Sequence, residues 1–360
     1  MPLPDSTANH GIAGTSIVCA DRNDYGMTGI VDEAAIRFVS VVTNGGLANS
    51  LLLAGTNSQP GDVVMVVMMF LLGQIGGNDW VPYEILQPVF DATLTVTANG
   101  RYVVAAGGNG ANNLDDPRLL RRFDLTFRDS GAFLAGASDG ALLTRAPFSN
   151  FGSRIDANSW GNGVMACGYG TLFYPNNDPL QAYTLAGTGT SSATALLAGV
   201  VTSIVGGCRA ELARDPTIPE LRQLMAAHGA QSPDPIGRRP DVHAILQAMG
   251  AIDGLETSAP DVGIGGTEHV LLSGPTASGA LVFANFAPGS TDLGLNRRIL
   301  LDLPGMMSLG FVAMPTGSAS IAVSIPADPG LHGVSLYFQA GILSGSAPVH
   351  VTNAGQLTVR

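Results

Sequence analysis

The chain has 360 residues, of which 46% are hydrophobic and only 12% are charged, so it has enough apolar side chains for two cores. Its formal net charge is −11 without any polybasic run, which argues against a partner such as nucleic acid or an anionic membrane surface. The longest apolar run, 63–72, is too short to span a bilayer, and we expect no membrane span. Three cysteines at irregular spacing predict neither a disulfide framework nor a metal site.

Up to about residue 250, short apolar stretches alternate with stretches typical of helices. Buried strands are expected at 35–42, 63–69, 102–106 and 132–135. Helices are expected at 11–20, 45–55, 84–99, 192–206, 217–228 and 240–248. This alternation predicts an α/β fold, a doubly wound parallel sheet with helices on both faces. Such a sheet binds its ligands beyond the carboxyl ends of its strands.

The sequence pattern changes near residue 250. Residues 251–260 are interpreted as a linker, and residues 261–360 hold short apolar runs separated by turns rich in Gly, Pro, Asn and Asp. We therefore expect two separate cores, an α/β domain at 1–250 and a small all-β sandwich at 261–360.

A Gly-Thr-Ser turn runs directly into an apolar helix of small residues and places Ser191 at the start of that helix. Unpaired N–H groups and the helix dipole favour negative charge there, which suits a nucleophilic serine. An ordinary N-cap is the alternative, because Ser and Thr are the usual capping residues. Two further segments favour the nucleophile. His10 leads another helix of small residues, and Asn109 lies in a Gly-rich turn after the apolar strand 102–106.

These three segments, in this chain order, resemble the His-Gly-Thr, Ala-Ala-Gly-Asn and Gly-Thr-Ser motifs of the subtilisin-like serine peptidases (subtilases), and the resemblance covers residues 9–250. It implies a subtilase fold with His10 as general base, Asn109 as oxyanion-hole donor and Ser191 as nucleophile. The resemblance also implies two walls along which an extended substrate binds. These substrate-binding residues are Leu71, Leu72 and Gly73 on one side, and Ala106, Gly107 and Gly108 on the other. Leu71 and Leu72 could equally complete the core face of their strand.

The chain also departs from the family pattern. Ile12 stands where the His motif usually has Thr, and Ala195 stands where the Ser motif usually has Pro. In the family an Asp precedes the His by roughly 30 residues, whereas only nine residues precede His10 and Asp5 is the sole acid among them. A truncated reading frame would explain the lack of this strand, of a signal peptide and of a pro-segment together. Loss of the Asp alone costs subtilisin roughly 3 × 10⁴ in kcat, so we expect weak turnover.

The sequence thus predicts a serine endopeptidase that acts on peptide or protein substrates without a cofactor or metal. Two alternatives remain, a serine esterase and an inactive pseudopeptidase with a binding role. The family is mostly secreted, although the first five residues have neither the basic nor the apolar region of a signal peptide. The missing strand predicts an unpaired edge at 36–42 or 63–69 and hence self-association, or else a contracted sheet in which these two strands pair directly.

Overall fold

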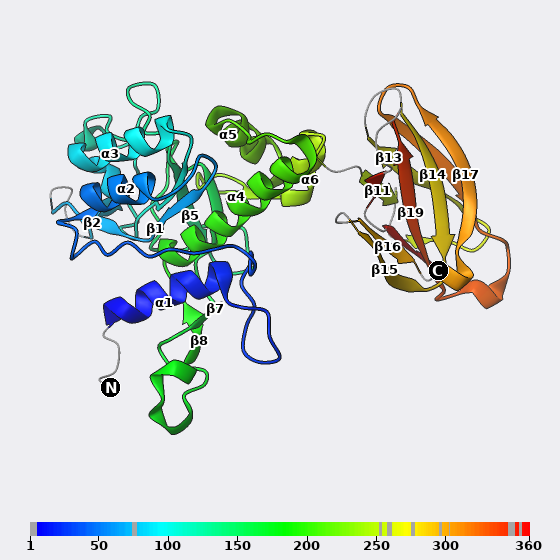
Figure 1. Cartoon of the computed structure of the whole chain (residues 1–360), viewed down its shortest axis with the longest axis horizontal. Coiled ribbons are helices and arrows are strands. Elements are labelled where there is room, and N and C mark those ends of the chain that lie inside the picture. Colours follow the sequence, from blue (N-terminus) through cyan, green and yellow to red (C-terminus); the bar gives the residue numbers. More distant parts are fainter. Residues whose placement is uncertain are drawn as a thin grey trace. The chain divides into compact units, whose positions relative to one another are not determined.

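The computed structural model of the chain describes residues 6–73, 78–251, 254–257, 261–274, 278–294, 297–301, 303–344, 350–352 and 355–360. The chain divides into two compact units, Met1–Ile245 and Leu246–Arg360 (Figure 1). The boundary between the units thus lies a few residues before the position near 250 at which the sequence pattern changes. Each unit is described by itself.

The first unit is built on a four-stranded parallel sheet of order β1-β4-β5-β6. Its strands are β1 (Val63–Val66), β4 (Tyr102–Ala106), β5 (Phe133–Ser138) and β6 (Ala157–Trp160). All six residues of β5 are buried, as expected for a strand that is covered on both faces. This is the α/β sheet that the apolar runs of the sequence predict.

Helices cover both faces of the sheet (Figure 1). They are α1 (Ser6–Cys19), α2 (Leu47–Thr56), α3 (Gln87–Ala98) and α4 (Thr190–Leu212). Helices α5 (Ile218–Ala227) and α6 (Val242–Ala248) follow α4 in the chain. Val64 and Val66 pack in one cluster with residues of α2 and α3. Met65, between them, packs in another cluster with residues of α1 and α4. Since successive residues of a strand point to opposite faces, the two helical layers lie on opposite sides of the sheet.

Two hairpins extend from the first unit. Strands β2 (Met69–Leu71) and β3 (Trp80–Pro82) pair antiparallel, as do β7 (Val164–Cys167) and β8 (Tyr183–Gly187). The expected strand 63–69 is therefore two strands, β1 and β2. The expected helix 84–99 is also divided, because the 3₁₀ turn η1 (Tyr83–Ile85) precedes α3 and a proline opens α3. The remaining short elements are η2 (Pro117–Leu119), η3 (Pro175–Asn177), η4 (Pro179–Gln181), β9 (Gly229–Ala230) and β10 (Arg239–Pro240).

The strand expected at 35–42 does not form. Residues 35–40 have no regular secondary structure and 41–45 form turns, while Phe38 and Val42 are 70% and 88% exposed. Within the described part of the chain β1 pairs only with β4, so β1 is an edge strand. The expectation of an unpaired edge is met at β1, and the alternative of a contracted sheet is wrong. A strand forms only beside a partner that pairs its backbone groups, and 35–42 has no such neighbour.

The helix α4 is the one described helix that is long and apolar enough to cross a membrane, and 67% of that window is buried. It contacts all four strands of the sheet, so it occupies the position of a core helix. Its small residues, among them Ala193, Ala195 and Ala198, allow this close approach.

The second unit is all-β and its sheets share one core. The smaller sheet has the order β11 (Gly254–Thr257), β13 (Thr267–Ser273), β18 (Ser318–Ser324). The larger has the order β12 (Asp261–Val262), β21 (Gly355–Val359), β19 (Ser335–Leu343), β14 (Ser278–Asn285), β17 (Met307–Met314), with β20 (His350–Val351) beside β19. The pair β15 (Pro288–Gly294) and β16 (Arg297–Leu301) and the turns η5 (Leu303–Gly305) and η6 (Pro329–Leu331) complete it.

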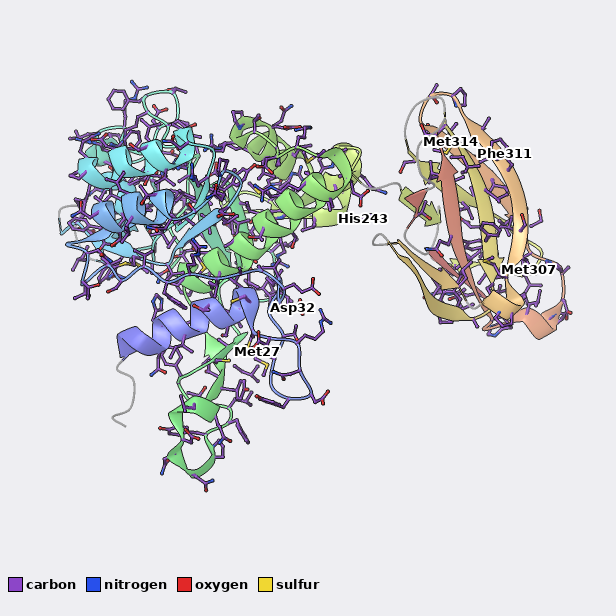
Figure 2. All side chains as sticks on the ribbon, in the orientation of Figure 1. Met27, Asp32, His243, Met307, Phe311 and Met314 are labelled. Atoms are coloured by element: carbon purple, nitrogen blue, oxygen red, sulfur yellow. The ribbon has the colours of Figure 1, made fainter. Side chains whose placement is uncertain are left out.

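Val270 and Leu272 of β13 pack in one apolar cluster with Val282 of β14 and Phe338 of β19, which makes the unit a sandwich. On β17, Met314 is buried in this core whereas Phe311 is exposed (Figure 2). The linker expected at 251–260 is corrected in part, because residues 254–257 form β11. Its residues 252, 253 and 258–260 lie outside the described residues.

Candidate active site

Ser191 is the second residue of α4, directly after a glycine turn. Gly189 has φ 94°, a left-handed backbone conformation that glycine adopts without strain. The N–H of Ser191 is in the first helical turn, where no carbonyl of the same helix can accept it. Both predicted local features of this serine, the tight turn and the helix start, are therefore present.

The amide of Asn109 is fixed beside the start of α4. Its Oδ1 accepts hydrogen bonds from the N–H of Thr190, at 2.9 Å, and from the Thr190 hydroxyl, at 2.8 Å. A backbone N–H can only donate, so these bonds decide which end of the amide is oxygen. The Nδ2 donor then lies beside Gly189: a β-carbon on Gly189 would lie 3.0 Å from Nδ2 and 3.7 Å from the N of Ser191. Two N–H donors, the Nδ2 of Asn109 and the backbone N–H of Ser191, thus border one small space. This space stays open because Gly189 has no side chain.

Asn150, which the sequence analysis did not single out, holds the turn that carries Asn109. Its Nδ2 donates to the carbonyls of Trp80 and Gly107, at 2.7 and 2.8 Å. Its Oδ1 accepts from the N–H groups of Gly110 and Asn112, at 3.1 and 2.8 Å. The side chain is fully buried, and all four of its hydrogen-bonding positions are used. Asn150 is therefore a positioning residue for the turn, about 40 residues away in sequence.

The hydroxyl of Ser191 donates to the main-chain carbonyl of Val67, at 3.2 Å. No hydrogen bond joins Ser191 to His10 in the structure as described. Val67 follows β1, which pairs only with β4 among the described residues, and its carbonyl accepts the serine hydroxyl. The apolar run 63–72 concealed where β1 ends, and Val67 therefore could not be recognised from the sequence.

His10 lies within α1, which begins at Ser6, five residues earlier than the expected helix 11–20. The imidazole is half-buried, and this burial lowers its pKa from the ordinary value. No acidic side chain of the described residues contributes to that shift, and Asp5 lies outside them. His10 is consequently neutral at pH 7 and able to accept a proton, but it has no carboxylate here to stabilise its cation.

His10 and Ser191 line one cavity of about 210 Å³. The cavity lies between α1, the β7–β8 hairpin and the start of α4. Its lining consists of His10, Ala13, Gly14, Ile17, Tyr169, Thr171, Thr184, Ala186, Gly187, Thr188, Ser191 and Ser192. The structure therefore brings His10 and Ser191 to one space, and Asn109, which is not part of this lining, to the same helix start. Their catalytic roles remain predictions.

The expected substrate walls occupy two different settings. Leu71 is half exposed on β2, Leu72 packs beside the cluster around Val81 and Leu114, and Gly73 follows with φ 68°. None of the three lines the cavity. Ala106 ends β4, Gly107 donates to the carbonyl of Ala135, and Gly108 donates to the hydroxyl of Thr190 at 3.2 Å, so this second wall lies directly beside Asn109. Substrate binding by either wall remains a prediction.

Within the ranges that the structure covers, no group of three or more His, Cys, Asp or Glu side chains could hold a metal ion. Two acidic side chains of the first unit have structural roles. Asp116 caps η2 by accepting from the N–H of Arg118, and Glu84 is buried against Arg154.

Comparison with known proteins adds a family and several folds. The family model of Peptidase S8, the subtilase family, matches residues 2–225. The self-cleaved protease domain of PatA is similar at 17% identity and a TM-score of 0.49, over 69% of this chain and 87% of that chain. A cold-adapted subtilisin-like serine proteinase is similar at 16% identity and a TM-score of 0.42, over 64% and 72%. A lanthipeptide protease is similar at 15% identity and a TM-score of 0.47, over 67% and 75%. No curated protein matches the chain.

Proposed function

Because the chain belongs to the subtilase family, we propose that it is a serine endopeptidase in which Ser191 attacks the carbonyl carbon of a peptide bond. The observation that carries the proposal is the space bordered by the Nδ2 of Asn109 and the N–H of Ser191. Two donors beside a serine are what a tetrahedral oxyanion requires. Capping of α4 uses only the Oδ1 of Asn109, which accepts from Thr190, and leaves its Nδ2 for the oxyanion.

The proposed reaction begins with a change at Ser191. Its hydroxyl leaves the carbonyl of Val67 and donates to His10, which takes the proton as the oxygen attacks the substrate carbon. The carbonyl oxygen becomes negative and accepts from Asn109 and from the N–H of Ser191. His10 then gives its proton to the leaving amine. Water repeats the sequence on the acyl-enzyme and releases the acid. Since no carboxylate of the described residues faces the His10 cation, turnover is expected to be weak.

Two observations favour the alternative functions. No carboxylate of the described residues perturbs His10, which favours an esterase, because esters have better leaving groups and need less help from the acid. The bond from Ser191 to Val67 favours a pseudopeptidase, because it engages the hydroxyl that would react. The exposed edge of β1 also supports the proposal that copies of the chain associate, which size-exclusion chromatography over a concentration series would test.

The test of the proposed function combines labelling with turnover. A fluorophosphonate probe should label Ser191 and should fail to label a Ser191→Ala variant. A Ser192→Ala variant is the matched control, since its hydroxyl lies next in the helix and donates to the carbonyl of Thr188. Cleavage of a peptide anilide supports the peptidase, and turnover of a p-nitrophenyl ester alone supports the esterase. Complete inertness with both substrates and the probe would refute both enzymes and favour the pseudopeptidase.

The pH dependence of turnover should reveal the environment of His10. The base must be neutral, so kcat/KM should rise with pH as His10 loses its proton and then level off. Burial lowers the pKa of His10, which places the midpoint of this rise below the ordinary value of 6.5. A pH series of kcat/KM at constant ionic strength measures it, with His228→Gln as a control that should leave the profile unchanged. A midpoint above 7 would contradict the prediction and would show that a carboxylate stabilises the cation.

A further inference from the structure

The cavity beside Ser191 lies on the side of the serine that faces His10. His10 lines it, whereas Asn109 does not. In the proposed reaction the oxyanion forms next to Asn109, and the leaving amine receives its proton from His10. The part of the substrate that follows the cleaved bond must therefore lie on the His10 side, where the cavity is. Its volume of about 210 Å³ exceeds the roughly 150 Å³ in which an apolar cavity holds benzene.

The chemistry of the lining selects a neutral, apolar group. Helix α1 contributes Ala13, Gly14 and Ile17, and β8 contributes Ala186 and Gly187. The hydroxyls of the threonines and of Ser192 in the lining are already bonded within the protein. Thr184 bonds to Thr171 and to the N–H of Ala186, Thr188 donates to Asn162, and Ser192 donates to Thr188. Apart from His10, the described lining holds one titratable side chain, Tyr169; burial raises the pKa of its phenol, which is therefore neutral at pH 7.

Tyr169 is held at this cavity in an unusual backbone conformation. Its φ is 57°, between Gly168 and Gly170, which also have positive φ. A tyrosine in the left-handed region is strained, and such strain persists only where the surroundings fix it. The N–H of Tyr169 donates to the side chain of Asn9, the residue before His10, at 3.3 Å. This hydrogen bond links the turn that carries Tyr169 to the same helix that carries His10.

We propose that this cavity binds the side chain of the residue that follows the cleaved bond, and that Tyr169 is a specificity-determining residue because its ring forms one wall. The substrates are peptides in which that residue is neutral and apolar, up to the size of a phenyl ring. This inference rests on the proposed function, since it assigns the leaving-group side of the same site.

The test uses three peptides that differ only after the cleaved bond, where they carry Phe, Ala or Asp. Wild-type kcat/KM should be highest for Phe and lower for Ala by about ten- to two-hundredfold, the range for filling an apolar pocket, and lowest for Asp. The Ala186→Trp variant should fill the cavity and lose the preference for Phe, while it still cleaves the Ala peptide. Leu185→Trp is the matched control. Leu185 directly precedes Ala186 in β8, so its side chain points to the other face of the strand, and it is half exposed.

Two variants of Tyr169 test its ring. Tyr169→Gly tolerates the left-handed turn and removes the wall, so the ratio of kcat/KM for Phe over Ala should fall at least tenfold. Tyr169→Phe keeps the ring and should keep the ratio. Equal kcat/KM for the three peptides, or an unchanged ratio in Ala186→Trp and Tyr169→Gly, would overturn the inference.

A binding measurement separates this inference from the peptidase proposal. If no peptide is cleaved, the peptidase proposal fails, and the wild-type protein is then titrated with phenylalaninamide and alaninamide while the His10 ring signals are followed by NMR. Shifts with phenylalaninamide that are weaker with alaninamide and are lost in Ala186→Trp support the cavity assignment. Signals that do not respond, or that respond equally to both amides, overturn it.

Discussion

Replacing Asn109 by Asp should lower kcat by at least about 10²–10³, the loss seen when one oxyanion-hole donor is removed. The substitution keeps an oxygen where Oδ1 accepts from the N–H and hydroxyl of Thr190. It replaces the Nδ2 donor by a carboxylate oxygen, which repels the oxyanion. KM should stay close to its wild-type value, because the donor meets the substrate oxygen only as negative charge develops.

Asn112→Asp is the matched control for that experiment. Asn112 lies in the same turn, and its Nδ2 donates to the carbonyl of Asn78 at 3.3 Å, away from Ser191. Kinetics with a fluorogenic substrate should show wild-type kcat for this control, and thermal melting should show both variants folded. A kcat unchanged in Asn109→Asp would refute the oxyanion role and leave the amide as a structural cap of α4.

The parts of the site that could be predicted from sequence are those that local geometry decides. Gly189 and Ser191 predict a tight turn and a helix start. Asn109 lies in a glycine turn that follows a five-residue apolar strand, 102–106. Strand β4 and helices α4 and α5 lie where the apolar patterns placed them, within two residues at their first residue. In each case the residues that decide the structure are neighbours in the chain.

The parts that could not be predicted depend on partners far away in the sequence. Residues 35–42 have the composition of a strand, but a strand requires a neighbour to pair its backbone groups. The missing strand predicted an unpaired edge at 36–42 or at 63–69, but composition could not say that 35–42 would not form a strand at all. The end of β1 depends on its pairing with β4, so the bond between Val67 and Ser191 was not foreseen. Asn150 acts on a turn about 40 residues earlier, and nothing near it marks it as different from other loop asparagines.

Removal of the Arg154 side chain should destabilise the first unit by about 3–5 kcal/mol, the cost of breaking a buried ion pair from one side. Its guanidinium is almost completely buried and donates to Glu84 at 2.9 Å, to Asp156 at 2.6 Å and to the carbonyl of Ala132 at 3.0 Å. Burial opposes the charge of Arg154, but the carboxylates of Glu84 and Asp156 outweigh it and hold its pKa above the usual range. An Arg154→Met variant would leave Glu84 buried without its cation, whereas Asp156 would keep its ion pair with Arg222 at 2.7 Å.

The measurement can be confined to the first unit, because both tryptophans, Trp80 and Trp160, belong to it. Urea unfolding followed by tryptophan fluorescence should show the full loss in Arg154→Met. The control Arg118→Met removes an exposed partner of Asp116 and should cost no more than about 1 kcal/mol. A loss below about 1 kcal/mol in Arg154→Met as well would mean that water reaches the Glu84 carboxylate. In that case charge does not hold η1, which carries Glu84, to β6, which begins beside Asp156. The packing of Leu134 and Ile155 then supplies the stability.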